Sequence, residues 1–397
     1  MKRAISADTS NQGRRVLAAV AVLAVVLGSI HAFSVLLIPL ERLLDVSRAS
    51  VSATYSLALA ALTLSVLWGH RIFAIWSAGR FVLGVGLLGA AGAWVAGMAG
   101  SLPVIWIGYS LLFGGANGLG YGFGLQIAAQ ANKGQEGKAM GIVTAAYALG
   151  ATLAPALFSY AVTSGGFQLA MLGLGAAVLL ASMASAALLK IAKFKFQVNQ
   201  DSRTAPSLPP DGFALLWVAY GAGVSGGLMI IGHAAGIASA QRLEAASWIA
   251  PAVIAASNLA GSLIAGRLMD RFSAQWLLST FPLLSAMSVG ALALTPSPAV
   301  MLAGFAGVGF TYGGIIAAYP ATIAKVFGAK SSSQIYGRVF TAWGLAGLVA
   351  PWLAGKFFAV TGNYSTALWV AAALAALSSA TALGFLSSAR LKNRLEA

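Results

Sequence analysis

The sequence predicts an all-α membrane protein with twelve transmembrane helices in two pseudo-symmetric six-helix bundles. Three observations support this fold class. Of the 397 residues, 59% are hydrophobic and only 8% are charged, whereas an ordinary soluble domain has about 25% charged residues. The apolar residues form continuous runs of about 20 residues, which is the length that a transmembrane helix needs. The two halves of the chain also repeat several short motifs.

Each apolar run is expected to form one membrane-spanning helix. Most of the runs are bounded by charged, glycine-containing or proline-containing segments, which are typical of loops at the membrane surface. In chain order, the twelve runs are 16–40, 51–69, 81–100, 102–131, 139–162, 169–189, 213–240, 245–265, 276–294, 300–324, 339–360 and 367–386.

The basic residues indicate how these helices are oriented. The formal net charge is +15. If the N-terminus lies inside, twenty of the 24 Lys and Arg residues fall in inner segments, while Arg42, Arg48 and Arg242 fall outside and Lys356 falls within the membrane. This asymmetry follows the positive-inside rule and predicts cytoplasmic N- and C-termini for a multi-pass protein of a bacterial cell inner membrane. It also explains the basic charge without a nucleic-acid partner.

A polar segment with three prolines divides the apolar runs into two sets of six, as expected for a cytoplasmic linker. The predicted organisation is a cytoplasmic tail over 1–15, a first bundle over 16–189, the linker over 190–212, a second bundle over 213–388 and a cytoplasmic tail over 389–397.

Three sequence echoes favour an internal duplication of six helices. His31 is followed 202 residues later by His233, and the Pro155 motif Leu-Ala-Pro returns 196 residues later as the Pro351 motif Val-Ala-Pro. The pair Tyr121-Gly122 returns 191 residues later as Tyr312-Gly313. The fourth and tenth runs are also rich in glycine. We interpret these glycines as helix-packing positions, because a dinucleotide-binding loop would require a preceding strand.

Lys356 is the most informative single residue, because no other Lys, Arg, Asp or Glu occurs between 339 and 388. A cation at membrane depth costs roughly 2.5 kcal/mol or more and usually marks a functional site that meets an anion. Lys356 is 17 residues after Val339, or about 25 Å along a helix, so a lysine that extends to the outer interface is the alternative. The residue nevertheless favours a carrier of small organic anions.

Several segments resemble one branch of the major facilitator superfamily, the oxalate/formate antiporters and monocarboxylate transporters. The resemblance covers nearly the whole chain. It is carried by Gly28-Ser29-Ile30-His31 in the first run, by Gly227-Leu228-Met229-Ile230-Ile231-Gly232-His233 in the seventh, and most strongly by Tyr312-Gly313-Gly314, Tyr319-Pro320 and Phe340-Thr341-Ala342-Trp343-Gly344 in the tenth and eleventh.

The resemblance implies a gate between the eighth and ninth runs. The superfamily's loop signature combines a glycine, an aspartate and an arginine, which match Gly266, Asp270 and Arg271. Such a charge cluster is expected to hold the cytoplasmic side closed, and a solvated loop with topogenic arginines is the alternative. The matching stretch of the first half, Gly69-His70-Arg71, lacks the aspartate, which argues against a symmetric gate.

A departure from the family pattern bears on the substrate. Members that handle dicarboxylates carry an arginine after the Asn-x-x-Gly element of the eighth helix, but here Asn258-Leu259-Ala260-Gly261 is followed by Ser262. A second buried carboxylate would therefore lack a cationic partner, which favours a monocarboxylate. The predicted substrate-binding residues are Lys356, His31, Tyr121, Ser262, Tyr312, His233, Trp343 and Asn258. Helix packing is the alternative role of the aromatic and histidine residues.

The expected partners are a small carboxylate, the lipid bilayer, and either protons or a counter-anion, because no Asp or Glu lies in mid-membrane. No cofactor or metal is expected, and an enzyme is disfavoured because His, Asp and Glu are not clustered at metal or acid–base spacing. We expect a monomer. A drug or metabolite exporter, and a non-transporting sensor or assembly partner, are the alternatives.

Overall fold

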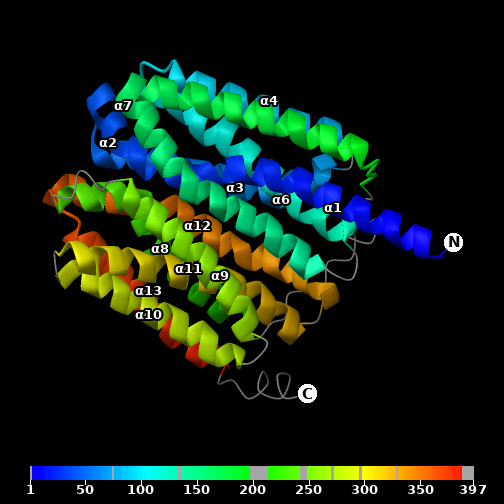
Figure 1. Cartoon of the computed structure of the whole chain (residues 1–397). Coiled ribbons are helices and arrows are strands. Elements are labelled where there is room, and N and C mark those ends of the chain that lie inside the picture. Colours follow the sequence, from blue (N-terminus) through cyan, green and yellow to red (C-terminus); the bar gives the residue numbers. More distant parts are fainter. Residues whose placement is uncertain are drawn as a thin grey trace. The chain divides into compact units, whose positions relative to one another are not determined.

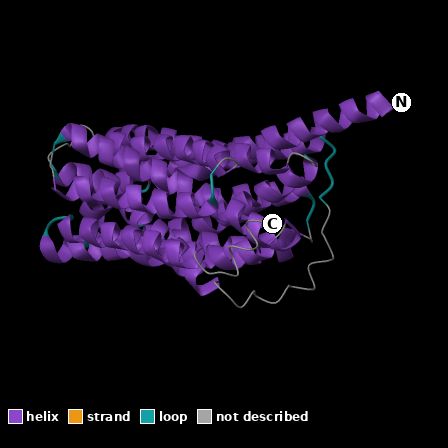
Figure 2. Ribbon diagram, turned by 90° about the horizontal axis from the view of Figure 1, so that it is seen from below, coloured by secondary structure: helices purple, strands orange, loops and turns teal. Residues whose placement is uncertain are grey.

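The structure is a computed structural model of the whole chain. It describes residues 2–73, 76–132, 136–196, 213–241, 248–269, 272–294, 297–327 and 329–386. Helices make up nearly all of the described chain, and the ribbon in Figure 2 shows no strand among these residues. The chain forms two compact units, Met1–Val46 with Leu57–Gln200 and Ser47–Ser56 with Asp201–Ala397.

The first unit contains the helices drawn from blue to green in Figure 1. Its elements are α1 (Lys2–Leu27), a 3₁₀ turn (Gly28–Ala32), α2 (Ser34–Leu44), the greater part of α3 (Arg48–Phe73), α4 (Ala78–Gly97), α5 (Leu102–Ile105), a π-helical stretch (Trp106–Phe113), α6 (Gly114–Ala131) and α7 (Glu136–Ile191).

The second unit contains the helices drawn from green to red, together with the first residues of α3. Its own helices are α8 (Phe213–Ala240), α9 (Ile249–Met269), α10 (Ala274–Leu294), α11 (Pro298–Phe327), α12 (Ala329–Thr361) and α13 (Ser365–Leu386). Ser47–Ser56 thus belong to the second unit, although in sequence they lie between the two segments of the first unit.

The apolar runs expected from the sequence all correspond to helices. Within the described ranges, ten helical segments are long and apolar enough to cross a membrane, and the shorter apolar helix Ile249–Ala265 matches the eighth run. One of the ten, Ala139–Ile191, covers both the fifth and sixth runs. It bends at Gly165 and Gly166, and the φ of 72° at Gly166 is a left-handed value that a residue without Cβ adopts at no steric cost.

The first run differs from its prediction. It is not one continuous helix, because the 3₁₀ turn Gly28–Ala32 separates α1 from α2. A stretch of 3₁₀ within a long helix often marks a functional hinge, and this one carries His31. The helix also begins at Lys2, so the segment expected as a tail is helical in the structure.

Glycine contacts show that the two halves pack their helices in the same way. A Cβ at Gly114 or Gly118 of α6 would collide with the backbone of Ala58 or Leu62 of α3, and a Cβ at Gly309 or Gly313 of α11 would collide with the backbone of Ile254 or Asn258 of α9. The corresponding residues are 195 or 196 positions apart. The glycine-rich runs are therefore packing surfaces, as their composition predicts.

This spacing corrects one of the sequence echoes. Gly313 of α11 corresponds to Gly118 rather than to Gly122, because each of the former two contacts the equivalent backbone of its partner helix. Tyr312 therefore corresponds to Asn117 and not to Tyr121. The pairing of Tyr121 with Tyr312, taken from the shared Tyr-Gly dipeptide, is wrong by about one helical turn.

Candidate functional site

A polar cluster surrounds His31 in the first unit. The ring of His31 meets the ring of Tyr147 edge-on at 5.6 Å between centroids, and Tyr121 packs against the same Tyr147 ring at 4.8 Å between centroids. The hydroxyl of Tyr147 donates a 2.9 Å hydrogen bond to Asn117 Oδ1, and Asn117 Nδ2 donates to the carbonyl of Leu27. The structure thus brings the predicted residues His31 and Tyr121 together through Tyr147.

The second unit carries a corresponding cluster on α9, α11 and α12. Trp343 Nε1 donates a 2.7 Å hydrogen bond to the hydroxyl of Tyr312, and both side chains are buried. The hydroxyl of Ser262 lies 3.1 Å from the carbonyl of Gly313 and 3.3 Å from Asn258 Oδ1. Four predicted site residues, Asn258, Ser262, Tyr312 and Trp343, therefore lie around the same stretch of α11.

The two clusters are built on equivalent positions. Tyr147 and Trp343 are 196 residues apart, and Asn117 and Tyr312 are 195 residues apart. In each half, an aromatic side chain of one helix donates its single polar hydrogen to a side chain of its neighbour. Buried tyrosine and tryptophan normally find such a partner. The sequence did not reveal this repeated pair, because the residue types differ at both pairs of equivalent positions, Tyr147 with Trp343 and Asn117 with Tyr312.

His233 belongs to a different network, near the end of α12. Its side chain is fully buried, Nε2 lies 2.8 Å from the carbonyl of Pro351, and Nδ1 lies 3.0 Å from the hydroxyl of Tyr364. Arg48 Nη1 donates a 2.8 Å hydrogen bond to the same hydroxyl. A carbonyl can only accept, so a neutral His233 carries its proton on Nε2, and Tyr364 donates to Nδ1 while it accepts from Arg48.

Sequence reasoning missed the contacts of Arg48. It counts Arg48 only among the cations on the outside, whereas the structure shows it as the first residue of α3, only 8% exposed. Its guanidinium lies 4.2 Å from the centre of the Phe358 ring, within the range of a cation–π contact. The available signal was the position of Arg48 next to an apolar run that begins three residues later.

Lys356 lies on the exposed side of α12, and its ammonium is 5.3 Å from the centre of the Trp352 ring. Trp352 is one helical turn closer to the middle of the segment. The ammonium therefore lies beside a residue one turn before Lys356, which is the direction in which helical side chains generally lean.

The structure does not place all predicted residues in one group. Lys356 is 13 residues after Trp343, or about 20 Å along α12, and thus lies near the level of the His233 network. For the predicted gate, Gly266 is a helical residue of α9, whereas Asp270 and Arg271 lie outside the described residues.

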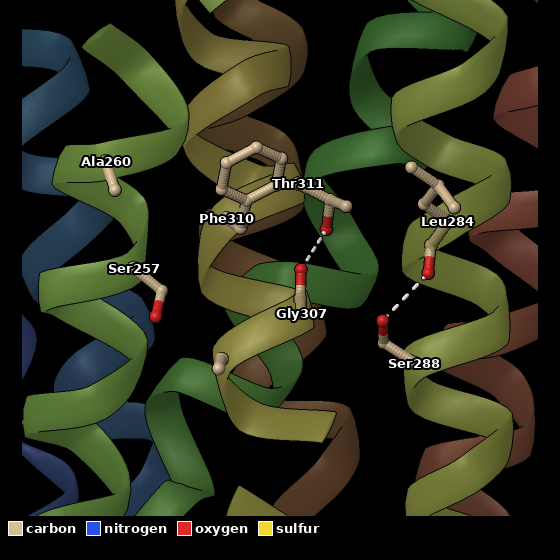
Figure 3. Close-up of a pocket in the computed structure, with 8 residues that line it drawn as sticks. Ser257, Ala260, Leu284, Ser288, Gly307, Phe310 and Thr311 are labelled. Atoms are coloured by element: carbon tan, nitrogen blue, oxygen red, sulfur yellow. Dashed lines mark hydrogen bonds between the residues drawn. The ribbon is translucent and has the colours of Figure 1, made fainter. Parts of the chain in front are cut away.

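A hollow of about 390 Å³ opens between α9, α10 and α11 of the second unit (Figure 3). Two of its three hydroxyl groups are engaged within their own helices, because Thr311 donates to the carbonyl of Gly307 and Ser288 to that of Leu284. No predicted site residue is among the described residues that line it. This hollow offers no charged group and is not the candidate site.

Comparisons with known proteins agree with this architecture. Residues 212–396 match the family model described as Major Facilitator Superfamily. The chain is 24% identical over 331 residues to an Escherichia coli (strain K12) protein described as "Uncharacterized MFS-type transporter YhjX", covering 81% of this chain and 82% of that protein.

Two solved structures have the same fold. They are those of a bacterial homologue of the human lysosomal transporter Spinster, in its inward-facing occupied and inward-facing unoccupied conformations. The first superposes with a TM-score of 0.72 and 14% identity, over 94% of this chain and 96% of that one. The second superposes with a TM-score of 0.68 and 13% identity, over 97% and 95% of the two chains.

Proposed function

Because the chain belongs to the major facilitator superfamily, whose members are membrane transporters and not enzymes, we propose that it carries a small organic anion across a bacterial inner membrane. The proposed mechanism is alternating access between two repeated bundles, in which the substrate site is exposed to each side in turn. A monocarboxylate is the favoured substrate. This identifies the substrate class more narrowly than family membership does.

The observation that carries the proposal is the direction of Lys356. A membrane lysine can serve the interface or a buried anion, and the contact of its ammonium with Trp352 directs it toward the middle of α12. An ammonium held over an aromatic face keeps its charge and its three donors. Lys356 can therefore form an ion pair with one carboxylate oxygen without a further protein acid.

The repeated polar pairs supply the other contacts that a small anion needs. Ligand sites are mostly apolar with a few well-placed polar groups. Tyr147 with Asn117 and Trp343 with Tyr312 present hydroxyl, amide and indole groups in otherwise apolar surroundings. We propose that each pair contacts the substrate within its own unit, together with His31 in the first unit and Ser262 in the second.

Arg48 changes the argument about substrate charge. The second unit contains Arg48 as well as Lys356, and the Arg48 guanidinium rests on Phe358, which is two residues after Lys356. Arg48 is thus a second cation of this unit, at another place than Ser262. We keep the monocarboxylate as the favoured substrate because Arg48 already donates a hydrogen bond to Tyr364 and packs on the Phe358 ring.

The decisive experiment is uptake of labelled monocarboxylates and dicarboxylates into proteoliposomes that contain the wild type or Lys356→Gln. We expect the wild type to take up a monocarboxylate and Lys356→Gln to lose this uptake by at least ~100-fold, because an unpaired buried carboxylate costs several kcal/mol. Lys356→Arg should retain part of the activity. Full uptake by Lys356→Gln would favour an exporter of drugs or neutral metabolites instead.

A matched control tests the direction of the lysine. Trp352→Phe keeps an aromatic face under the ammonium, whereas Trp352→Leu removes it. We expect the first variant to retain the apparent affinity and the second to weaken it about 2–10-fold, since exposed to partly desolvated cation–π contacts contribute about 0.5–1 kcal/mol or more. Equal behaviour of both variants would show that Trp352 does not orient Lys356.

The substrate charge is tested by comparing oxalate with a monocarboxylate. With one available cation, we expect the monocarboxylate to be favoured by at least ~100-fold. Ser262→Arg should raise the affinity for oxalate and lower that for the monocarboxylate. If the wild type binds oxalate as well or better, Arg48→Gln will show whether Arg48 supplies the second charge.

The same vesicles distinguish the two forms of coupling. Exchange requires a counter-anion inside the vesicle, whereas proton-coupled uptake responds to an imposed pH gradient. Exchange suits Lys356, because an empty carrier with a bare cation within the membrane should reorient slowly and a loaded one should move. Uptake that needs a pH gradient but no internal anion would contradict exchange.

A further inference from the structure

A second hollow, of about 720 Å³, lies in the first unit between the start of α4 and the end of α7. Its residues play no part in the proposed transport site. Most belong to the first turns of α4, to the last turns of α7, or to residues 193–195 just after α7. The described lining consists of Ser77, Ala78, Gly79, Arg80, Leu83, Met183, Ala186, Ala187, Leu189, Lys190, Lys193, Phe194 and Lys195.

Four of these residues are cations, and the described lining contains no Asp or Glu. The side chains of Arg80, Lys190, Lys193 and Lys195 are all exposed. Arg80 comes from α4, and the three lysines come from the end of α7 and the segment after it. Two elements far apart in the sequence thus bring positive charge to one hollow, which is the footprint of an anion site.

The chain path at the end of α7 is what turns the lysines into the hollow. Lys193 has a left-handed φ of 49°. Its N–H donates to the carbonyl of Lys190, and the N–H of Phe194 donates to the carbonyl of Leu189. This is the Schellman arrangement that ends many helices, usually with glycine at the left-handed position. The Phe196 ring packs on Phe123 at 5.3 Å between centroids, which anchors the residues just after the turn.

The start of α4 adds donors of its own. Ser77 precedes the helix in an extended conformation and makes no side-chain capping bond. The first N–H groups of a 20-residue helix have no partner inside the helix and attract anions. The residues of this terminus, 77–80, line a hollow that already carries four cations, so that the helix terminus is one contribution among several.

The opposite wall of the hollow is apolar. Leu83 is one turn into α4, Met183 is about two turns before the end of α7, and both are exposed, as is Ala187. The charged groups thus lie at the helix ends and the apolar groups lie deeper along the helices. A free phosphate needs only the first set, whereas a lipid with a phosphate headgroup and acyl chains needs both.

We propose that this hollow binds the phosphate headgroup of an anionic phospholipid, with an acyl chain along Leu83, Met183 and Ala187. Basic pockets between membrane helices on the cytoplasmic side commonly hold such headgroups. The positive-inside rule alone explains basic residues at these loops, but it does not require them to line a common hollow beside an apolar wall.

Native mass spectrometry of the full-length protein in neutral detergent tests this site. Dioleoylphosphatidylglycerol and dioleoylphosphatidylcholine are titrated separately. The wild type should retain the anionic lipid at a concentration at least ten-fold lower. Arg80→Gln with Lys193→Gln should weaken this binding about 30-fold, because each basic residue near an anionic lipid contributes about a factor of five to ten.

Arg14→Gln with Arg15→Gln is the matched control. It removes the same charge from the same unit at exposed residues that do not line the hollow, and it should leave lipid binding unchanged. Equal losses in the two double variants would overturn the proposal in favour of diffuse charge. Lys193→Gly removes one cation while it keeps the left-handed turn, so it tests the charge if the glutamine variant folds poorly.

Two further arms identify the ligand. Ala187→Trp fills the apolar wall without changing any charge, and it should weaken retention of the anionic lipid. Inorganic phosphate, added in phosphatidylcholine micelles, should not raise the midpoint of thermal unfolding as the anionic lipid does. Protection by phosphate equal to that by the lipid, or normal lipid retention by Ala187→Trp, would overturn the lipid assignment.

Discussion

His31 and His233 are the histidines of the first and seventh apolar runs, but they have different surroundings. His31 lies in a 3₁₀ turn, is half-buried, and meets the edge of Tyr147 beside Tyr121. His233 lies within the continuous helix α8, is fully buried, and has both ring nitrogens in contact with Pro351 and Tyr364. The first histidine lies beside a polar cluster, whereas the second links Pro351 to Tyr364 through its two ring nitrogens.

The packing register explains this difference. Helix contacts relate the two halves by 195 or 196 residues, whereas the histidines are 202 residues apart. In the same register, Gly227 of α8 is the residue equivalent to His31. An added Cβ at Gly227 would collide with the Tyr312 ring. His233 is therefore about six residues, or roughly 9 Å, further along its helix. Identical residue types in repeated sequences need not mark equivalent sites.

His233→Ala should have the largest effect on stability. It removes one buried hydrogen bond to the Pro351 carbonyl and one to the Tyr364 hydroxyl, which still accepts from Arg48. Each loss should cost about 0.5–1.5 kcal/mol, and the missing ring also opens a cavity. We expect a clear fall in the midpoint of thermal unfolding in detergent and poor membrane insertion. His31→Ala is the paired control and should lower the midpoint much less. Equal losses would contradict the contrast between the two histidines.

The fold was predictable because its main signals are local. Continuous apolar runs and the distribution of Lys and Arg identify spans such as 213–240 without any tertiary contact. The break at Gly28–Ala32 was not predictable, because a hydropathy pattern does not distinguish a 3₁₀ turn from an α-helix. Of the three sequence echoes, only the Pro155 and Pro351 motifs, 196 residues apart, have the register of the packing. The other two do not, since the register depends on backbone contacts such as those of Gly118 and Gly313 rather than on residue identity.

Tyr364→Phe should have the next largest effect. The hydroxyl of Tyr364 connects Arg48 to His233, so its removal leaves a charged donor and a ring nitrogen without this partner. We expect a loss of about 1–3 kcal/mol, seen as a lower unfolding midpoint and a smaller change than in His233→Ala. Tyr160→Phe is the matched control, because Tyr160 is 73% exposed. A fall in the control as large as in Tyr364→Phe would contradict the network.

The site was predictable in part. Tyr312, Trp343, Asn258 and Ser262 were all selected from one sequence, and they lie around one stretch of α11. Arg48 was missed because the positive-inside rule counts charges by loop and does not report burial. Asn117 and Tyr147 could be noted only as polar or aromatic residues, because their hydrogen bond joins two helices and the two residues are 30 positions apart in sequence.

The repeated polar pairs should respond alike if the repeat is functional. Trp343→Phe and Tyr147→Phe each remove one polar hydrogen and leave a buried acceptor, Tyr312 or Asn117, with one bond fewer. We expect each variant to lose about 0.5–1.5 kcal/mol of stability and to bind substrate more weakly. Thermal unfolding and proteoliposome uptake measure the two effects. An effect of only one variant on uptake would show that the two halves do not share the substrate equally.

His31→Gln should have the smallest effect on stability and a selective effect on transport. Glutamine keeps a donor and an acceptor but not the ring that meets Tyr147 edge-on. Such aromatic contacts contribute about 0.5–1.5 kcal/mol, so the unfolding midpoint should change only slightly. If His31 contacts the substrate, the apparent affinity should fall about ten-fold, which corresponds to roughly one hydrogen bond. His31→Phe keeps the ring and removes the polar atoms, so it should preserve stability and lose affinity. Unchanged uptake by both variants would assign His31 to packing, and the polar cluster of the first unit would then contain Asn117, Tyr121 and Tyr147 alone.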